Sequence, residues 1–262
     1  MRAFLDLPWG QVHLRTIGDA KGPLLLMLHQ SPLSSREYQA VLPLLTEAGR
    51  PVALDTPGFG LSDPPHADWE VADYAEAIWK VADLFSAGEP INLFGRATGA
   101  VLAYAMVQAR PAAAHRLILH GLPVYTRAER AERLSSFAPP YELASDGSHL
   151  TWIWNRIKNE YPWADPALAT SLVRDYLAAG PDFATAYRAI WRYDLESLRL
   201  PEVIPTLLIG GSRDRIAYMH ARAVRFIPAA TAVWLEGCTD FVAEQQPERF
   251  ARILVSFLSA SR

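Results

Sequence analysis

The chain of 262 residues predicts an α/β protein with a mostly parallel sheet flanked by helices. Three observations support this fold class. Continuous apolar runs are typical of strands buried on both faces of a parallel sheet, amphipathic segments lie between these runs, and a glycine-rich turn at 95–99 joins a strand to a helix. Strands and helices that alternate in this way favour right-handed crossovers.

The first half of the chain contains most of the predicted sheet. Residues 11–17 alternate between apolar and polar side chains, which predicts a partly exposed strand. The expected elements that follow are a strand at 24–28, a helix at 35–47, a strand at 51–55, a helix at 71–86, a strand at 91–94, a helix at 100–109 and a strand at 116–121.

The pattern changes between residues 123 and 200, where no buried strand is predicted and aromatic side chains recur at helical spacing. The α/β pattern then resumes. We expect a strand at 203–210, a helix at 218–227, a strand at 231–235 and a helix at 247–259. The sequence therefore predicts a core of residues 1–122 and 201–262, interrupted by a helical insertion at 123–200.

The segment from Ile91 to Ala100 is the most informative one. An apolar strand runs into Gly95-Arg96-Ala97-Thr98-Gly99, and a helix of small residues follows. The pattern G-x-S-x-G at such a position forms a tight turn that exposes a nucleophilic serine. In this chain Ala97 stands at the serine position, so the turn is preserved without its nucleophile.

Five motifs, taken in their order, give a specific resemblance. They are His29-Gln30-Ser31-Pro32, residues 55–60, residues 95–99, residues 210–214 and residues 237–241. In this order and spacing the chain resembles the α/β-hydrolase superfamily over nearly its full length. The resemblance implies an α/β-hydrolase fold in which the insertion at 123–200 is a cap over the active site.

The resemblance also assigns catalytic positions. It places the nucleophile at Ala97, the acid at Asp214 and the base at Asp240, where the superfamily normally has a histidine. Residues 231–262 contain no histidine. Serine hydrolysis of the usual kind needs a hydroxyl or thiol to attack and an imidazole to accept its proton, so this sequence excludes it. The backbone N–H groups of Ser31 and Thr98 are implied as an intact oxyanion hole.

Other groups could take over the chemistry. Asp214 and Asp240 are expected to face each other, either sharing a proton as an acid/base pair or bridged by Arg213 or Arg215. His120 ends a strand at the carboxyl edge of the sheet and is either a replacement base or a hinge residue bonded to backbone. Further candidate substrate-binding residues are His29, for which a structural role is favoured, Gln30, Arg96, Tyr125, Trp152, Trp154 and Trp191. The aromatic cluster either packs the insertion or walls an apolar pocket.

Composition limits the possible partners and location. The net charge of −3 makes nucleic acid an improbable partner, and no apolar run is long enough to span a membrane. A single cysteine, Cys238, suits a reducing compartment and excludes an internal disulfide. We expect a cytoplasmic monomer or homodimer that binds a small molecule, with no metal and no cofactor.

Three functional hypotheses follow. The first is an enzyme that uses acid/base groups and the oxyanion hole on a small, largely apolar carbonyl compound, as a lyase, isomerase or cyclase. The second is a serine-type ester or C–C hydrolase that carries an inactivating substitution at Ala97. The third is a non-catalytic protein of the same fold that binds a ligand, because fold alone does not distinguish binding from catalysis.

Overall fold

The computed structural model describes residues 1–66, 68–137, 141–201 and 203–260. Its centre is an eight-stranded sheet in the order β1-β2-β4-β3-β5-β6-β7-β8. β1 is antiparallel to β2 and β2 to β4, while the remaining pairs are parallel. The strands are β1 (Arg2–Leu7), β2 (Gly10–Thr16), β3 (Leu24–Leu28), β4 (Arg50–Leu54), β5 (Ile91–Arg96), β6 (Ala114–His120), β7 (Thr206–Arg213) and β8 (Thr231–Thr239). The mostly parallel sheet flanked by helices that the sequence predicted is therefore confirmed.

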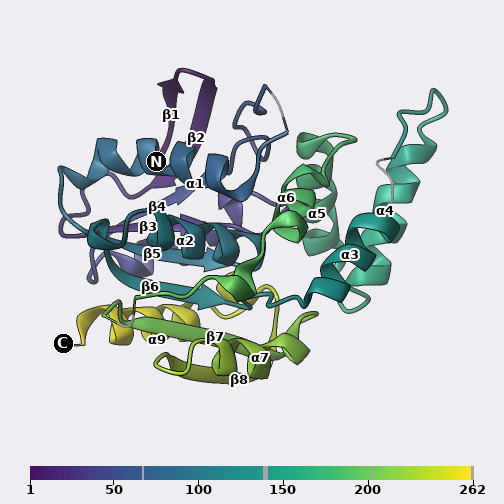
Figure 1. Cartoon of the computed structure of the whole chain (residues 1–262). Coiled ribbons are helices and arrows are strands. Elements are labelled where there is room, and N and C mark those ends of the chain that lie inside the picture. Colours follow the sequence, from purple (N-terminus) through teal and green to yellow (C-terminus); the bar gives the residue numbers. More distant parts are fainter. Residues whose placement is uncertain (67, 138–140, 202, 261–262) are drawn as a thin grey trace.

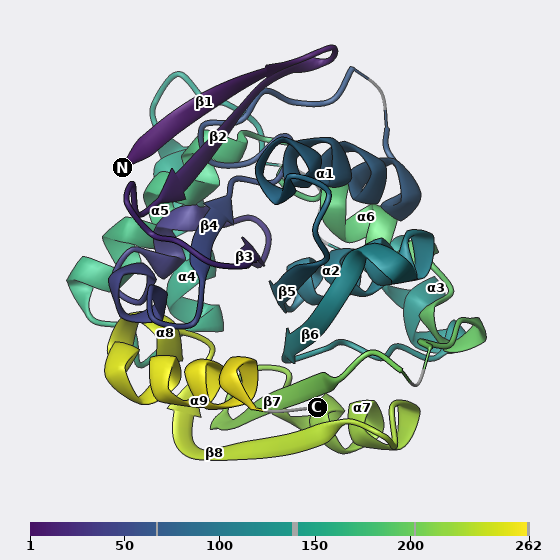
Figure 2. The same cartoon turned by 90° about the vertical axis from the view of Figure 1, so that its left-hand side faces the viewer.

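Helices cover both faces of the sheet (Figures 1 and 2). Apolar side chains of α1, α2 and α7 pack in one buried cluster, and those of α8 and α9 pack in another with residues between β3 and β4. The described helices are α1 (Val71–Ser86), α2 (Thr98–Ala109), α3 (Arg127–Ser136), α4 (Ser148–Glu160), α5 (Pro166–Ala179), α6 (Thr185–Arg192), α7 (His220–Phe226), α8 (Val242–Gln245) and α9 (Pro247–Ser259).

The prediction of a helix at 35–47 was wrong. The segment forms two short 3-10 helices instead, η1 (Ser35–Tyr38) and η2 (Leu42–Leu45). Pro43 explains the interruption, because proline has no N–H to donate and its ring clashes with the carbonyl of residue i−4 in an α-helix. The apolar stripe that suggested a helix is still buried, and it packs against the sheet.

Two strands differ in extent from the prediction. The strand expected at 203–210 begins at Thr206, and Val203 is exposed. The strand expected at 231–235 continues to Thr239, so it carries the chain up to Asp240. The first strand also has an antiparallel partner, β1, which was not predicted.

The segment between β6 and β7 contains α3, α4, α5 and α6, which lie beyond one edge of the sheet in Figure 1. Part of it has an apolar cluster of its own, which also takes in Leu33 and Phe241 from outside the segment. α6 instead packs against α2 in the main core. The division into a core and a cap domain remains a prediction. Among the described residues, no helix combines the length and apolarity needed to cross a membrane.

Candidate functional site

Ala97 lies at the tip of a strained turn between β5 and α2. Its φ of 47° and ψ of −109° are unusual for a residue with a side chain. A Cβ atom at Gly95 would clash with the backbone of Gly99, and one at Gly99 would clash with the backbone of β3. The glycines are therefore required for the close approach of strand and helix, and the turn has the geometry that exposes a nucleophile although Ala97 supplies none.

Arg96, the residue before the turn, has its guanidinium between the two carboxylates. The side chain is fully buried, and its Nη2 lies 2.8 Å from Asp214 Oδ2 and 3.4 Å from Asp240 Oδ2. Its position depends on Gly121, since a Cβ there would collide with Nη1 of Arg96. A guanidinium cannot lose its proton under ordinary conditions, so it holds a permanent positive charge at this point.

Arg215 contacts Asp240 from the other side. Its backbone N–H donates to Asp240 Oδ1 at 2.9 Å, and its Nε donates to Oδ2 at 3.4 Å. Of the two arginines expected as possible bridges, Arg215 contacts Asp240, whereas Arg213 is exposed. The main bridge is Arg96, which was expected only as a pocket residue. The arginine-bridged alternative for the two aspartates thus matches the geometry better than a pair that shares a proton.

Asp214 is buried, as is Asp240. Burial raises its pKa, and the neighbouring Arg96 opposes that shift. Its Oδ1 accepts a hydrogen bond from the backbone N–H of Ile216 at 2.8 Å. Asp214 therefore serves as the buried counter-ion of Arg96, in contact with a guanidinium where the resemblance implied a histidine.

His120 lies behind the carboxylates. Its Nε2 is 4.0 Å from Asp214 Oδ2, and its ring packs 5.6 Å from that of Phe250. Burial and the nearby charge of Arg96 lower its pKa well below the usual value, so the imidazole is neutral. His120 is not among the residues lining the cavity at Ala97. Its placement supports the structural alternative over the replacement base.

The two oxyanion candidates contact each other. The backbone N–H of Ser31 donates to Thr98 Oγ1 at 2.7 Å, and Thr98 Oγ1 donates to Ser31 Oγ at 3.1 Å. The hydroxyl of Tyr187 on α6 donates to the carbonyl of Ser31. The N–H of Thr98 opens α2, where first-turn N–H groups have no intrahelical acceptor. One of the two implied donors is thus already hydrogen-bonded.

A cavity of about 40 Å³ adjoins Ala97. Such a volume holds only about one or two water molecules. Gln30 stands out in its wall, because its Nε2 is buried and has no acceptor within the described structure. The residues lining the cavity are Gln30, Ser31, Arg96, Ala97, Thr98, Pro123, Tyr125, Tyr187, Ile190, Trp191, Arg215, Ile216 and Asp240.

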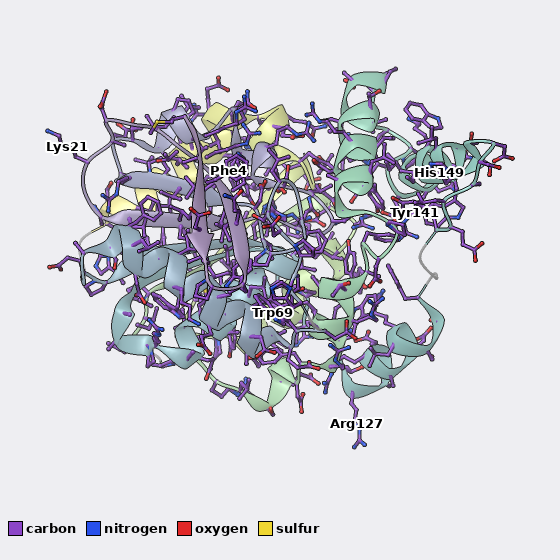
Figure 3. All side chains as sticks on the ribbon, turned by 90° about the horizontal axis from the view of Figure 1, so that it is seen from above. Phe4, Lys21, Trp69, Arg127, Tyr141 and His149 are labelled. Carbon is purple, nitrogen blue, oxygen red and sulfur yellow. The ribbon has the colours of Figure 1, made fainter. Side chains whose placement is uncertain are left out.

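Three expected binding residues lie elsewhere. Trp152 packs against Tyr141 and Phe183 in the apolar cluster of the insertion, and Trp154 is partly exposed. Figure 3 shows Tyr141 in this region, beside His149, whose ring is nearly parallel to it. The His29 ring bonds the carbonyl of Gln30 and the N–H of Thr56, as expected for a structural histidine. Of the three tryptophans, only Trp191 reaches the cavity.

The sequence did not single out four of the residues that line the cavity. Pro123, Ile190 and Ile216 were not candidates, and Tyr187 belonged only to the general group of aromatic side chains in the insertion. Helical spacing gives a signal for two of them, because Tyr187, Ile190 and Trp191 occupy i, i+3 and i+4 on one face of α6. The cavity therefore lies between α6, which is a helix of the insertion, and the turn at residues 95–99.

The sheet, the elbow and the site define an α/β-hydrolase, and comparison with known proteins agrees. A model of the alpha/beta hydrolase family matches residues 25–253, so the chain belongs to this family. The chain is 24% identical to 2-(acetamidomethylene)succinate hydrolase of Mesorhizobium japonicum over 96% of its length and 93% of the relative. It is 23% identical to haloalkane dehalogenase 2 of Mycobacterium bovis, with the same coverage.

Solved structures match the same fold along almost the whole chain. A hydrolase from Pseudomonas aeruginosa PA01 has a TM-score of 0.80 at 21% identity and covers 99% of this chain and 98% of its own. An enol-lactonase from Burkholderia xenovorans LB400 has a TM-score of 0.78 at 16% identity, covering 98% and 100%. At these identities the likeness shows the fold alone.

Proposed function

We propose that this α/β-hydrolase-superfamily member hydrolyses a small, largely apolar carbonyl compound by direct attack of water, without a covalent intermediate. The observation that carries the proposal is a juxtaposition in one cavity. Gln30 offers an amide donor that has no acceptor, and Asp240 offers a carboxylate, both beside Ala97. A donor for a carbonyl oxygen and an acceptor for a water proton are the two groups that such a reaction needs.

The reaction balances with these groups. Water is held by Asp240, and its oxygen bonds to the carbonyl carbon while a proton passes to the carboxylate. The negative charge that develops on the carbonyl oxygen is stabilised by the Gln30 amide and by the guanidinium groups of Arg96 and Arg215. The bond to the leaving group then breaks, and the leaving group takes the proton. Because Asp240 is ion-paired with Arg96 and Arg215, we expect proton transfer to its carboxylate to be slow and turnover to be low.

The choice of hydrolysis rests on the names of the relatives. The sequence by itself favoured elimination, isomerisation or cyclisation, since it excludes an acyl-enzyme at Ala97. The curated relatives are named a hydrolase and a dehalogenase, which supports the hydrolase alternative over the lyase and isomerase readings. Hydrolysis by water keeps that reaction class without requiring a nucleophilic side chain.

In this proposal, substrate reaches the cavity beside Ala97 by displacing α6. The cavity is too small for an organic molecule, and Tyr187, Ile190 and Trp191 of this helix form part of its wall. Displacement of a helix or lid on substrate binding is common in enzymes that exclude water from the reaction. We therefore propose that α6 moves outward when substrate binds.

The test uses water labelled with ¹⁸O. The protein is incubated with small esters and enol lactones, and the products and the intact chain are measured by mass spectrometry. We expect one solvent oxygen in each acid product, no acylated chain, and at least about 100-fold slower turnover in Asp240→Asn. Asp83→Asn, which alters an exposed ion pair with Arg110, is the matched control and retains full activity. Acylated protein, or ¹⁸O in the peptide containing Asp240, would contradict the proposal.

A second candidate function is ligand binding without turnover. It is favoured by the hydrogen bond that already occupies the Ser31 N–H and by the ion pairs that hold both aspartates. The same incubation separates the two functions. Binding detected by calorimetry with no product in the wild type, and with the same affinity in Asp240→Asn, would favour this second function.

A further inference from the structure

A second cavity of about 210 Å³ lies away from the elbow, between the β1-β2 hairpin and α5. The hairpin and α5 are both labelled in the upper left part of Figure 2. Arginines reach the cavity from four elements: Arg2 from β1, Arg15 from β2, Arg36 from η1 and Arg174 from α5. No residue is shared with the wall of the elbow cavity, so this is a separate place on the molecule.

The two carboxylates in this cavity are already occupied. Asp55 accepts hydrogen bonds from the N–H groups of Ser35 and Leu61 at 2.6 and 2.9 Å, and its Oδ2 lies 2.8 Å from His13. Burial opposes ionisation, but these bonds outweigh it and lower the pKa of Asp55 to about 2. Its negative charge attracts Arg15 and offsets part of the positive charge of the cavity.

Asp175 is also engaged. It forms an ion pair with Arg36 at 2.6 Å and accepts a hydrogen bond from Ser34 at 3.1 Å. Burial raises its pKa, which Arg36 opposes. Four guanidinium groups thus share the cavity with two carboxylates, of which Asp175 is ion-paired with Arg36, and the cavity has an excess of positive charge.

Arg15 has a donor without an acceptor. Its Nε is buried and unpartnered among the described residues, and its Nη1 makes only a long bond of 3.4 Å to Gln39. Burial lowers the pKa of Arg15; Asp55 and Asp175 oppose this shift, while repulsion from Arg2 and Arg36 adds to it. A buried donor without a partner is costly, and an anion in the cavity would satisfy it and relieve the repulsion.

We propose that this cavity is a binding site for a compact dianion, a phosphate group being the best match. Phosphate oxygens accept pairs of parallel N–H bonds from guanidinium groups, and the cavity offers such groups from several directions. A dicarboxylate shares this chemistry less completely, because its charges are further apart. The bound anion would join the sheet to α5, since Arg15 comes from β2 and Arg174 from α5.

The test measures binding and thermal stability with inorganic phosphate as the probe and succinate as the second arm. Sodium chloride at equal ionic strength controls for screening. We expect saturable heat of binding for phosphate and an increase in the midpoint of thermal unfolding that grows with its concentration. Arg15→Gln and Arg174→Gln are each expected to weaken phosphate binding at least about tenfold.

Arg127→Gln is the matched control. Arg127 is exposed and points away from the molecule in Figure 3, so the same loss of charge there leaves phosphate binding unchanged. Tighter binding of succinate than of phosphate would overturn the assignment of the ligand. Absence of saturable binding, or equal weakening in Arg127→Gln and Arg174→Gln, would overturn the site itself. Because Arg174 is exposed, its substitution also tests the site without disturbing the core.

Discussion

At the level of single residues, Arg96 supplies the buried positive charge that the two carboxylates of the site contact. It lies fully buried, and its guanidinium contacts both Asp214 and Asp240. A buried ion pair gives little net stability compared with apolar packing, but removing one partner leaves an uncompensated charge. Arg96 is thus needed to compensate the buried charge of the two carboxylates, whichever reaction the site catalyses.

Replacing Arg96 with methionine is expected to lower the free energy of unfolding by about 3–5 kcal/mol at neutral pH. The loss is expected to shrink as the pH falls, because protonation of the two aspartates removes the unpaired charge. Urea denaturation at several pH values measures both effects. Arg110→Met removes an exposed pair with Asp83 and costs about 1 kcal/mol or less. Equal losses in the two variants would contradict this role of Arg96.

At the level of elements, a side-chain hydrogen bond connects α6 to the loop that follows β3. The hydroxyl of Tyr187 donates to the carbonyl of Ser31. The same helix closes the cavity beside Ala97. This bond therefore links the insertion to the implied oxyanion loop.

Tyr187→Phe removes that hydroxyl and is expected to destabilise the fold by about 1 kcal/mol. If substrate entry needs outward movement of α6, the variant also admits small ligands faster. Stopped-flow binding and chemical denaturation measure these two quantities. Tyr193→Phe is the control, because the Tyr193 hydroxyl has no hydrogen bond in the described structure, and a change within about 0.5 kcal/mol is expected. An unchanged stability in Tyr187→Phe would show that the bond does not hold the helix.

At the level of the whole molecule, the sequence predicts the architecture well, since strand runs, helical spacing and the glycine turn all report local structure. It predicts the partners of charged groups poorly. Arg96 and Asp240 are 144 residues apart in the sequence and meet only because β5 and the end of β8 reach the same edge of the sheet. From their sequence positions, Arg213 and Arg215 were equal candidates to bridge the two aspartates. Only the path of the chain after β7 places Arg215 against Asp240 and leaves Arg213 exposed.

Stability is also expected to depend on pH through Glu244. Burial raises its pKa to about 7 from an ordinary value near 4.5, with Arg36 opposing and Asp175 reinforcing the shift. The nearby buried Glu37 also interacts with it. Since the folded state binds this proton more tightly, its contribution is complete below the ordinary pKa and is lost as the pH rises through 7.

Glu244→Gln removes this dependence. Between about pH 5 and pH 8 the free energy of unfolding is expected to shift by about 2–3 kcal/mol in favour of the variant relative to wild type. Denaturation curves at both pH values measure the shift. Glu89→Gln, at an exposed position, is expected to behave as wild type at both values. A constant difference between Glu244→Gln and wild type would contradict the raised pKa.

Covalent catalysis at the elbow needs a base that takes the proton of the nucleophile as well as the nucleophile itself, and the residues lining the cavity include no histidine. Ala97→Ser restores the nucleophile alone, on a turn with the strained backbone that holds a serine in the G-x-S-x-G pattern. The measurement is a titration with p-nitrophenyl acetate, with the mass of the intact chain recorded alongside. We predict no burst of nitrophenol and no acetylated chain, since no histidine is among the residues lining the cavity to take the hydroxyl proton rapidly, and Asp240, ion-paired with Arg96 and Arg215, supports only slow proton transfer. A burst of one equivalent of nitrophenol with acetyl transfer to residue 97 would show that a serine alone restores covalent catalysis at this turn.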